Sequence, residues 1–549
     1  MIFTYEFTYI SNNAVLENFL YYFAKSDNLD FSITKEKDKI FLHVNANEDD
    51  FLRFSDDLSN NLPISIFLKD TKVYVSEEFE ENSKLSLCDI TLPFTNLTAK
   101  RAKEEFNPFI KNEIGQNPDI FPPLAFTCKN ENIEFNDNFK SAFVKLSDEI
   151  TKNGANIKTT NGTFFVSTLE NHKNFDDFFV MPTDLSVVDR MVVIKNSEIL
   201  ALASLEKPLL KLSTSLVFSS KYPDFSRFVK IGLANDLFLY LLSLTLFEKG
   251  VDFVLLSKQK EGVATLRFFG DIKKQKPFEV VVLENGEVLI KSQNNYLGKS
   301  TNLEKLESIK EISHRSFVSV LRENSLFSEK SIGFFLSKTK ADNIMFFDEQ
   351  SGLLDFVGLE YKSSIVEILE DIKSQDENAK RLIENYKTKF SDIYKTIEKL
   401  SLDENSPKNL YNVFKIISSI FGFSDNLENA AEKLLENAEL FAGEKGPRFD
   451  YKLENENNLK TSFDTYKLIR SAISYKMADV DDMLLSFGLI ESLVFFISDL
   501  SDRYKEALKS QNIALCGSLF SERKFSSLCI KHMSVNHKVK FNKELPLEF

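Results

Sequence analysis

An apolar run, Ile513-Ala514-Leu515-Cys516, leads directly into the small residues Gly517 and Ser518, and a helical pattern follows from Ser521 to Met533. A strand that ends in a turn of small residues before a helix can present backbone N–H groups to a phosphate. The same pattern is typical of an ordinary tight turn between a strand and a helix. The segment therefore predicts α/β architecture, with a phosphate-facing turn and a ligand-free turn as the two alternatives.

A second segment of this kind is Met345-Phe346-Phe347-Asp348-Glu349-Gln350-Ser351-Gly352. An apolar strand that ends in a carboxylate and a glycine turn is how many α/β folds place an aspartate that faces a metal ion or a nucleotide. An ordinary hairpin turn has the same pattern. Asp348 and Gly352 are therefore candidate site residues, with the hairpin as the alternative.

Composition limits the class of protein. The 549 residues include 43% hydrophobic residues, enough for large cores and for several domains at about 150 residues each. Lys and Arg number 68 against 82 Asp and Glu, which gives a net charge of −14. This charge argues against nucleic acid as the main partner, because phosphate backbones require a basic surface, and it leaves a local basic groove as the alternative.

Cysteine and histidine are scarce, with four and five residues in the whole chain. Cys529, His532 and His537 are the nearest approach to a cluster, but their spacing matches no zinc finger, and we predict no metal site. The first residues lack a signal peptide pattern. The longest apolar run, Leu237 to Phe247, is too short to span a bilayer, so we expect a cytoplasmic protein without membrane insertion.

Hydrophobic periodicity predicts a small α/β unit over residues 1–76 in the order strand, helix, strand, strand, helix, strand. Residues 77–137 carry five of the thirteen prolines and are predicted to be a connector. Residues 138–275 are predicted to be α/β again, with strands that include Met191–Ile194 and Glu198–Leu202. Residues 276–549 are predicted to begin with strands, to continue with one long helical stretch over 363–400, and to be mainly helical up to the strand at 513–516.

Motifs for covalent or phosphoryl chemistry are missing. The sequence has no G-x-S-x-G nucleophile elbow and neither of the common glycine-rich phosphate loops, G-x-x-x-x-G-K-[ST] and G-x-G-x-x-G. We therefore predict no catalytic residue.

The two segments quoted above resemble one family. Residues Ile513–Phe525 are similar to the "ALSGGVFQNRLL" segment in the Kae1-like carbamoyltransferase domain of the HypF proteins, which mature nickel–iron hydrogenases. Phe347–Gly352 stands where that domain has "FDGTGYG", and Leu427–Ala431 resembles its "YEGQAA". Further upstream, Pro93–Thr98 looks like the "YPFTNCTHCGPR" zinc-finger segment, and Glu149–Gly162 is similar to the opening of the YrdC-like domain.

The resemblance implies an α/β multidomain fold with four parts. These are an acylphosphatase-like ferredoxin sandwich at 1–76, a degenerate zinc-finger-like connector at 77–137, and a YrdC-like domain at 138–275. The fourth is a Kae1-like, actin-like domain at 276–549 with a helical C-terminal half. It also implies candidate nucleotide-binding residues, which are Gly517, Ser518, Arg523, Asp348 and Gly352.

The departures from the family pattern concern its chemistry. Leu97 and Ala99 stand near expected zinc ligands, and Ile10-Ser11-Asn12-Asn13 replaces the phosphate loop with its arginine. The HxxxH iron ligands and the "DGG" motif have no counterpart up to Phe549, and Ser518 replaces a glycine. A site without cationic groups and metal ligands stabilises carbamoyl-adenylate chemistry poorly.

The sequence thus favours a degenerate HypF-like protein, of the HydE-type accessory class, that acts in hydrogenase maturation by protein binding and without a cofactor. Its expected partners are a hydrogenase subunit or another maturation protein. The alternative is a divergent but active carbamoyltransferase that retains binding of ATP with magnesium.

Overall fold

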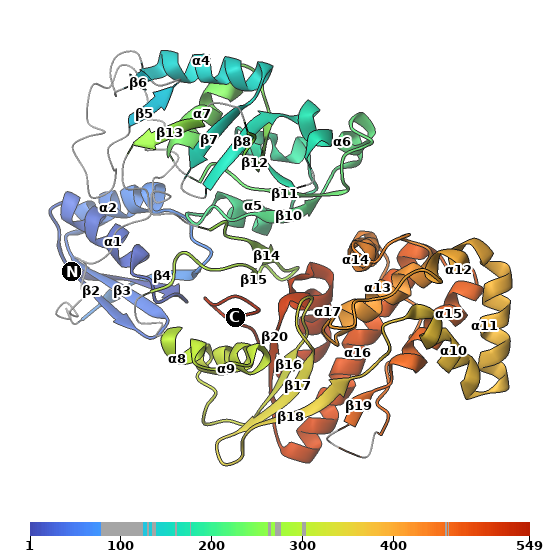
Figure 1. Cartoon of the computed structure of the whole chain (residues 1–549). Helices are drawn as coiled ribbons and strands as arrows, with labels where there is room; N and C mark the ends of the chain where they lie inside the picture. The colour runs from blue at the N-terminus through green and yellow to red at the C-terminus, as the bar shows by residue number, and fades with distance from the viewer. Residues whose placement is uncertain are drawn as a thin grey trace. The chain divides into compact units, whose positions relative to one another are not determined.

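The structure, a computed structural model, divides the chain into two compact units (Figure 1). Unit 1 consists of Met1–Val282 and Ser292–Thr301, and unit 2 of Leu283–Lys291 and Asn302–Phe549. The described residues are 1–77, 125–128, 131–133, 139–159, 162–175, 177–235, 237–261, 265–269, 276–298, 303–455, 458 and 461–549. Most of the predicted connector at 77–137, with the Pro93–Thr98 segment, lies outside them.

Unit 1 begins with a four-stranded antiparallel sheet in the order β2-β3-β1-β4. Its elements are β1 (Ile2–Tyr9), α1 (Val15–Ser26), β2 (Asp30–Glu36), β3 (Lys39–Asn45), α2 (Glu48–Asn61) and β4 (Leu68–Ser76). The predicted order of strands and helices is therefore present. Alternation along β1 buries Phe3, Tyr5 and Phe7, and Phe51 of α2 stacks on Phe3 with ring centroids 3.7 Å apart.

The rest of unit 1 is built on a nine-stranded sheet in the order β10-β11-β9-β12-β8-β7-β13-β5-β6. Its elements are β5 (Ala125–Cys128), β6 (Glu131–Ile133), α4 (Phe139–Lys152), β7 (Ala155–Thr159), β8 (Gly162–Thr168), β9 (Phe178–Pro182), α5 (Asn196–Ala203), β10 (Leu210–Ser213), α6 (Leu216–Lys221), β11 (Phe228–Ile231), α7 (Leu237–Glu248), β12 (Phe253–Lys258), β13 (Thr265–Phe269) and β14 (Val280–Val282).

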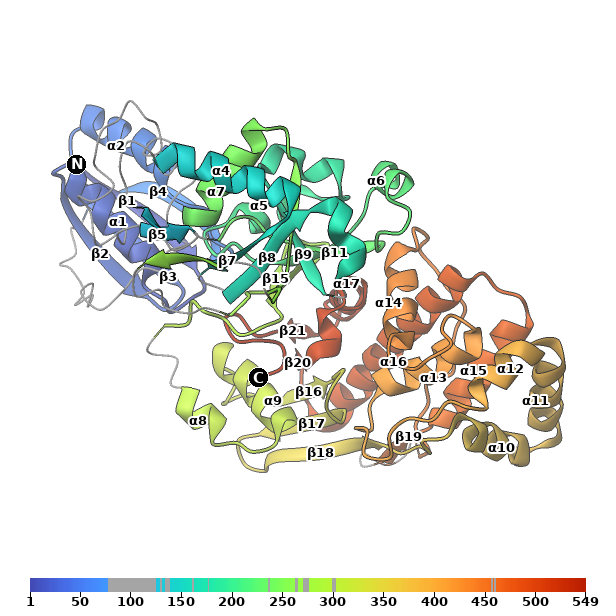
Figure 2. The same ribbon diagram turned by 45° about the horizontal axis from the view of Figure 1, so that its top comes forward.

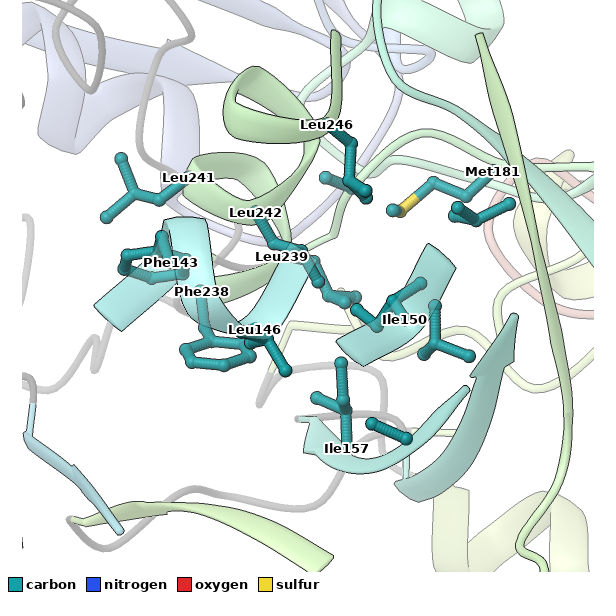
Figure 3. Close-up of a cluster of buried hydrophobic side chains, with 14 of the residues drawn as sticks. Phe143, Leu146, Ile150, Ile157, Met181, Phe238, Leu239, Leu241, Leu242 and Leu246 are labelled. Atoms are coloured by element: carbon teal, nitrogen blue, oxygen red, sulfur yellow. The ribbon is translucent and has the colours of Figure 1, made fainter. Parts of the chain in front are cut away.

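Helices α4 and α7 cover this sheet and form its main apolar core (Figure 3). Phe143 and Ile150 of α4 meet Phe238 and Leu242 of α7, and all four side chains are buried. The apolar run from Leu237 to Phe247 is thus part of a core helix, α7.

Shortening one side chain in this core tests its packing. We expect Ile150→Val to lower the free energy of unfolding by about 1 kcal/mol, because it deletes one methylene from a close-packed interior. Val144→Ala on the same helix is the control, since Val144 is 37% exposed. Thermal melting of both variants checks this, and an equal shift in the two would contradict the assigned core.

Two strand predictions in unit 1 are wrong. Glu198–Leu202 is part of helix α5, whose first turn is closed by a hydrogen bond from the Lys195 N–H to Glu198 Oε2 (2.8 Å). The short run of Ile, Leu and Ala fits helix and strand equally well by periodicity, and this local bond favours the helix. Met191–Ile194 forms only one isolated bridge, between Val192 and Thr214.

Unit 2 contains a six-stranded sheet in the order β19-β18-β17-β16-β20-β21. Its strands are β16 (Ser331–Phe335), β17 (Asn343–Asp348), β18 (Gly352–Leu359), β19 (Thr461–Phe463), β20 (Asn512–Cys516) and β21 (Lys538–Lys540); β15 (Val288–Ile290) precedes them. One face packs on α9 (Ile312–Glu323), where Phe317 meets Met345 and Cys516. On the other face Phe356 packs on Tyr504 of α16 (Asp482–Leu508), with centroids 5.3 Å apart.

The other helices of unit 2 are α8 (Leu303–Glu307), α10 (Ile365–Gln375), α11 (Glu377–Lys389), α12 (Ser391–Ile397), α13 (Leu410–Phe421), α14 (Ala430–Leu440), α15 (Thr465–Met477) and α17 (Arg523–Met533). Figure 2 shows α10, α11 and α12 beside α13 and α15. The helical stretch predicted over 363–400 is present and is divided into three helices, α10, α11 and α12. The Asp376 carboxylate begins α11 by accepting the Ala379 N–H (2.7 Å), and it also pairs with Arg470.

Helix α16 is the described helix that is long and apolar enough to suit a membrane span. However, 67% of the 18-residue apolar stretch in this helix is buried inside the structure. The core helix of a protein that does not span a membrane has the same property. A cytoplasmic location therefore stays a prediction.

Candidate functional site

Two turns lie side by side at one end of the unit 2 sheet. Strands β16 and β20 are parallel, and Phe335 pairs with Cys516 at their last residues. The loop Leu336–Asp342 therefore leaves the sheet beside the turn Gly517–Ser518. Both segments lie in unit 2, and ligands in α/β sheets commonly bind at such strand ends.

Gly517 has a conformation that only glycine adopts without strain. Its φ is +101°, and a Cβ at this position would lie within 3.0 Å of three backbone atoms of Leu336. The two turns are also tied together, because the Leu519 N–H donates to the Leu336 carbonyl oxygen (3.0 Å). The glycine is thus required by the close approach of the two turns.

The N–H groups of the Gly517 turn already have partners within the chain. Gly517 N–H donates to the Leu547 carbonyl oxygen (2.6 Å), and Ser518 N–H donates to Glu548 Oε2 (2.9 Å). The Ser337 hydroxyl donates to the same Oε2 (2.7 Å), and the Thr339 hydroxyl donates to Glu548 Oε1 (2.8 Å). We call Ser337, Thr339 and Ser518 the carboxylate cradle.

Two cations near the cradle, Lys338 and Arg523, are paired with carboxylates. Lys338 Nζ lies 2.8 Å from Glu432 Oε1 and 2.6 Å from Glu522 Oε1. Burial alone would lower the pKa of Lys338, but the two carboxylates outweigh it and raise the pKa above the ordinary lysine value. Arg523 Nε donates to Glu439 Oε1 (2.7 Å), so the arginine predicted to lie near phosphate is engaged by a carboxylate.

A buried carboxylate fixes the loop that carries the cradle. Asp342 is buried, and its carboxylate accepts the N–H groups of Ser337 and Leu410, both at 2.7 Å. Burial raises the pKa of Asp342 to about 8, and the two N–H donors act in the opposite direction. The loop is therefore held from inside unit 2 as well as from the sheet.

Asp348 and Gly352 lie elsewhere. Asp348 pairs with Gly352 across the β17–β18 hairpin, and its carboxylate accepts the Gln350 N–H (3.0 Å). Phe347 pairs with Ser331, the first residue of β16, whereas the cradle follows Phe335, the last. These two ends of β16 are about 13 Å apart by the rise per residue. The structure thus brings Gly517, Ser518 and Arg523 into one region, and it does not bring Asp348 and Gly352 there.

The histidines and cysteine near residue 530 also have other partners. Cys529 is fully buried, His537 Nε2 lies 2.9 Å from Asp502 Oδ1, and the His532 ring packs on Phe495. Among the described residues, no group of three or more His, Cys, Asp or Glu side chains is arranged to hold a metal ion.

Sequence reasoning missed most of the cradle. No known motif contains Ser337, Thr339 or Glu548, although Ser337-Lys338-Thr339-Lys340 is a polar run directly after an apolar strand. That run was a usable signal for a loop at a strand end. Glu548 had no such signal, because it reaches the loop from 211 residues away in the chain.

The two units together define a mixed α/β multidomain protein with a HypF-like fold. The chain is similar throughout to a crystal structure of full-length HypF in its phosphate- and nucleotide-bound form, with 14% identity, a TM-score of 0.57, and 100% of this chain and 96% of that one covered. It is also similar to HypF of T. kodakarensis, with 12% identity, a TM-score of 0.66 and coverage of 100% and 97%.

At the sequence level the chain is similar to Protein HydE of Wolinella succinogenes. The two are 26% identical over 528 residues, which cover 92% of each chain. The Sec7 domain family also matches residues 290–439. This range contains β16, β17 and β18 without β20 and β21, so it cuts through the six-stranded sheet and does not correspond to a structural unit.

Proposed function

We propose that this chain acts in the maturation or assembly of nickel–iron hydrogenases, as a HypF-like protein that works by binding another protein. Its similarity to Protein HydE and to HypF over nearly the whole chain supports the maturation role. Its partner is a hydrogenase subunit or another maturation protein. In this role the chain carries out no catalytic step.

The occupied cradle is the observation that supports binding without group transfer. The Ser518 N–H and two hydroxyls, which could contact a phosphate, donate to Glu548 instead. Lys338 and Arg523 neutralise carboxylates of α14 and of the segment before α17. Moving the Lys338 amine away from Glu432 and Glu522 would leave two partly buried carboxylates without a counter-charge, which lowers stability. In this arrangement the residues do not fit ATP with magnesium.

A divergent active carbamoyltransferase is the second candidate, and one observation favours it. The Gly517 turn lies beside the hydroxyl donors of Ser337 and Thr339, and an oxyanion site requires such a group of converging donors. Calorimetry of the full chain with ATP and magnesium separates the two candidates. We expect no tight binding to the wild type, and Asp348→Ala is expected to behave identically because Asp348 lies at the other end of the sheet.

Genetic complementation tests the proposal directly. We expect deletion of the gene in its host to lower hydrogenase activity and the nickel content of the large subunit. The wild type and Thr339→Val should restore both equally, because a binding protein does not need the exposed Thr339 hydroxyl. Loss of restoration by Thr339→Val at a normal protein level would favour the enzyme, and unchanged hydrogenase after deletion would exclude the maturation role.

A further inference from the structure

Glu548 is bound in the way that a protein binds an oxyanion ligand. Oε2 accepts hydrogen bonds from Ser337 Oγ and Ser518 N, and Oε1 accepts one from Thr339 Oγ1, all between 2.7 and 2.9 Å. The donors come from two different turns and converge on one carboxylate. Hydrogen bonds to an ionised acceptor are shorter and stronger than neutral ones, and these lengths agree with that.

The contact is one that an external anion could take over. Among the described residues, no lysine or arginine nitrogen bonds the Glu548 carboxylate, so no salt bridge has to break when it leaves. Thr339 is exposed, and Glu548 itself is half-buried, so one side of the cradle is open to solvent. Ser337 is fully buried and lies at the floor of the cradle.

The position of Glu548 is set by the segment that carries it. Pro546 and Leu547 are buried, and the Pro546 carbonyl oxygen accepts from Asn542 Nδ2 (2.7 Å). The Leu547 N–H donates to the Ile290 carbonyl oxygen (2.9 Å). The backbone thus delivers the carboxylate to the cradle, and its effective concentration there is high, in the millimolar range or above.

We propose that the segment Pro546–Glu548 is an internal ligand, whose carboxylate closes the cradle of Ser337, Thr339 and Ser518 to external oxyanions of the phosphate class. The contact is autoinhibitory, since a phosphate-class anion must displace Glu548 before it can bind. This inference rests on the closed site of the proposed function and not on the hydrogenase role.

Phosphate titration of the full chain is the test, with inorganic phosphate as the probe. We expect Glu548→Ala to bind phosphate at least tenfold more tightly than the wild type, because three donors become available. The double variant Glu548→Ala/Thr339→Val should bind phosphate about tenfold more weakly than Glu548→Ala, since one hydrogen bond to a charged ligand is lost. Glu370→Ala, which removes an exposed acid from α10, controls for net charge and should leave phosphate affinity unchanged.

Amide hydrogen exchange gives a second readout that does not depend on affinity. The peptide that contains Ser518 should exchange faster in Glu548→Ala than in the wild type, and phosphate should slow it again. Equal phosphate affinity of the wild type and Glu548→Ala, or unchanged exchange at Ser518, overturns the inference. If Glu548→Ala fails to fold, the same comparisons with Glu548→Ser, whose side chain is too short to reach the three donors, decide it. Tight binding of ATP by the wild type would refute the proposed function, whereas this inference is judged only by the difference between the variant and the wild type.

Discussion

Gly517→Ala is expected to lower the stability of unit 2 by about 4 kcal/mol, which corresponds to a fall of about 10 °C in its melting temperature. Two effects add. The φ of +101° is strained for any residue with a Cβ, at a cost of about 1–3 kcal/mol. In addition, the new methyl group meets the backbone of Leu336, which cannot turn aside as a side chain would, and overpacking of this kind costs about 1–3 kcal/mol.

Two other glycines of unit 2 separate these effects. Gly352 has a φ of +71° with nothing within 4 Å of its Cβ position, so Gly352→Ala should show the backbone strain alone, about 1 kcal/mol. Gly358 has neither feature, and Gly358→Ala should leave the melting temperature unchanged or raise it slightly. Calorimetric melting of the three variants gives the ranking. A Gly517→Ala variant no less stable than Gly352→Ala would mean that the two turns do not approach as closely as described.

Local patterns were sufficient to predict β20, the turn at Gly517 and the helix after it. An apolar run, a glycine and a helical period are all properties of adjacent residues. The location of Asp348 could not be predicted in this way. Its distance from Gly517 depends on which end of β17 lies beside the end of β20, and that register is fixed only when the strands pair through β16. Both hypotheses about Asp348 matched the same local sequence, and the structure shows the hairpin.

The cradle shows a second limit of sequence reasoning. Thr339 and Glu548 are 209 residues apart, and nothing in either neighbourhood indicates the other. Helix boundaries within 363–400 were more accessible, because Asp376 is a residue type that commonly begins helices. The continuous apolar stripe suggested one helix, since α10 and α11 both bury residues at helical spacing.

Lys338→Met is expected to cost about 3 kcal/mol, the second-largest loss among these variants. Its amine bonds both Glu432 and Glu522, and the side chains of all three are at least two-thirds buried. Methionine fills the same volume but leaves two carboxylates without their cation, and an uncompensated pair of like charges is strongly destabilising. Since the carboxylates raise the pKa of Lys338, the wild type keeps this charge throughout the neutral range, and the loss should be fully developed at pH 7.

Further variants separate the effect of losing the Lys338 charge from the effect of losing its packing contacts. Lys330→Met is the matched control, because Lys330 lies 3.9 Å from Asp348 and is 45% exposed, so its removal should change the melting temperature little. Combining Lys338→Met with Glu432→Gln and Glu522→Gln should recover most of the stability, because no stranded charge remains. The deficit of the single variant should also shrink as the pH falls toward about 4, where free glutamates take up protons. If the triple variant is no more stable than Lys338→Met, the amine acts through packing and not as the counter-charge that keeps these two carboxylates beside the cradle.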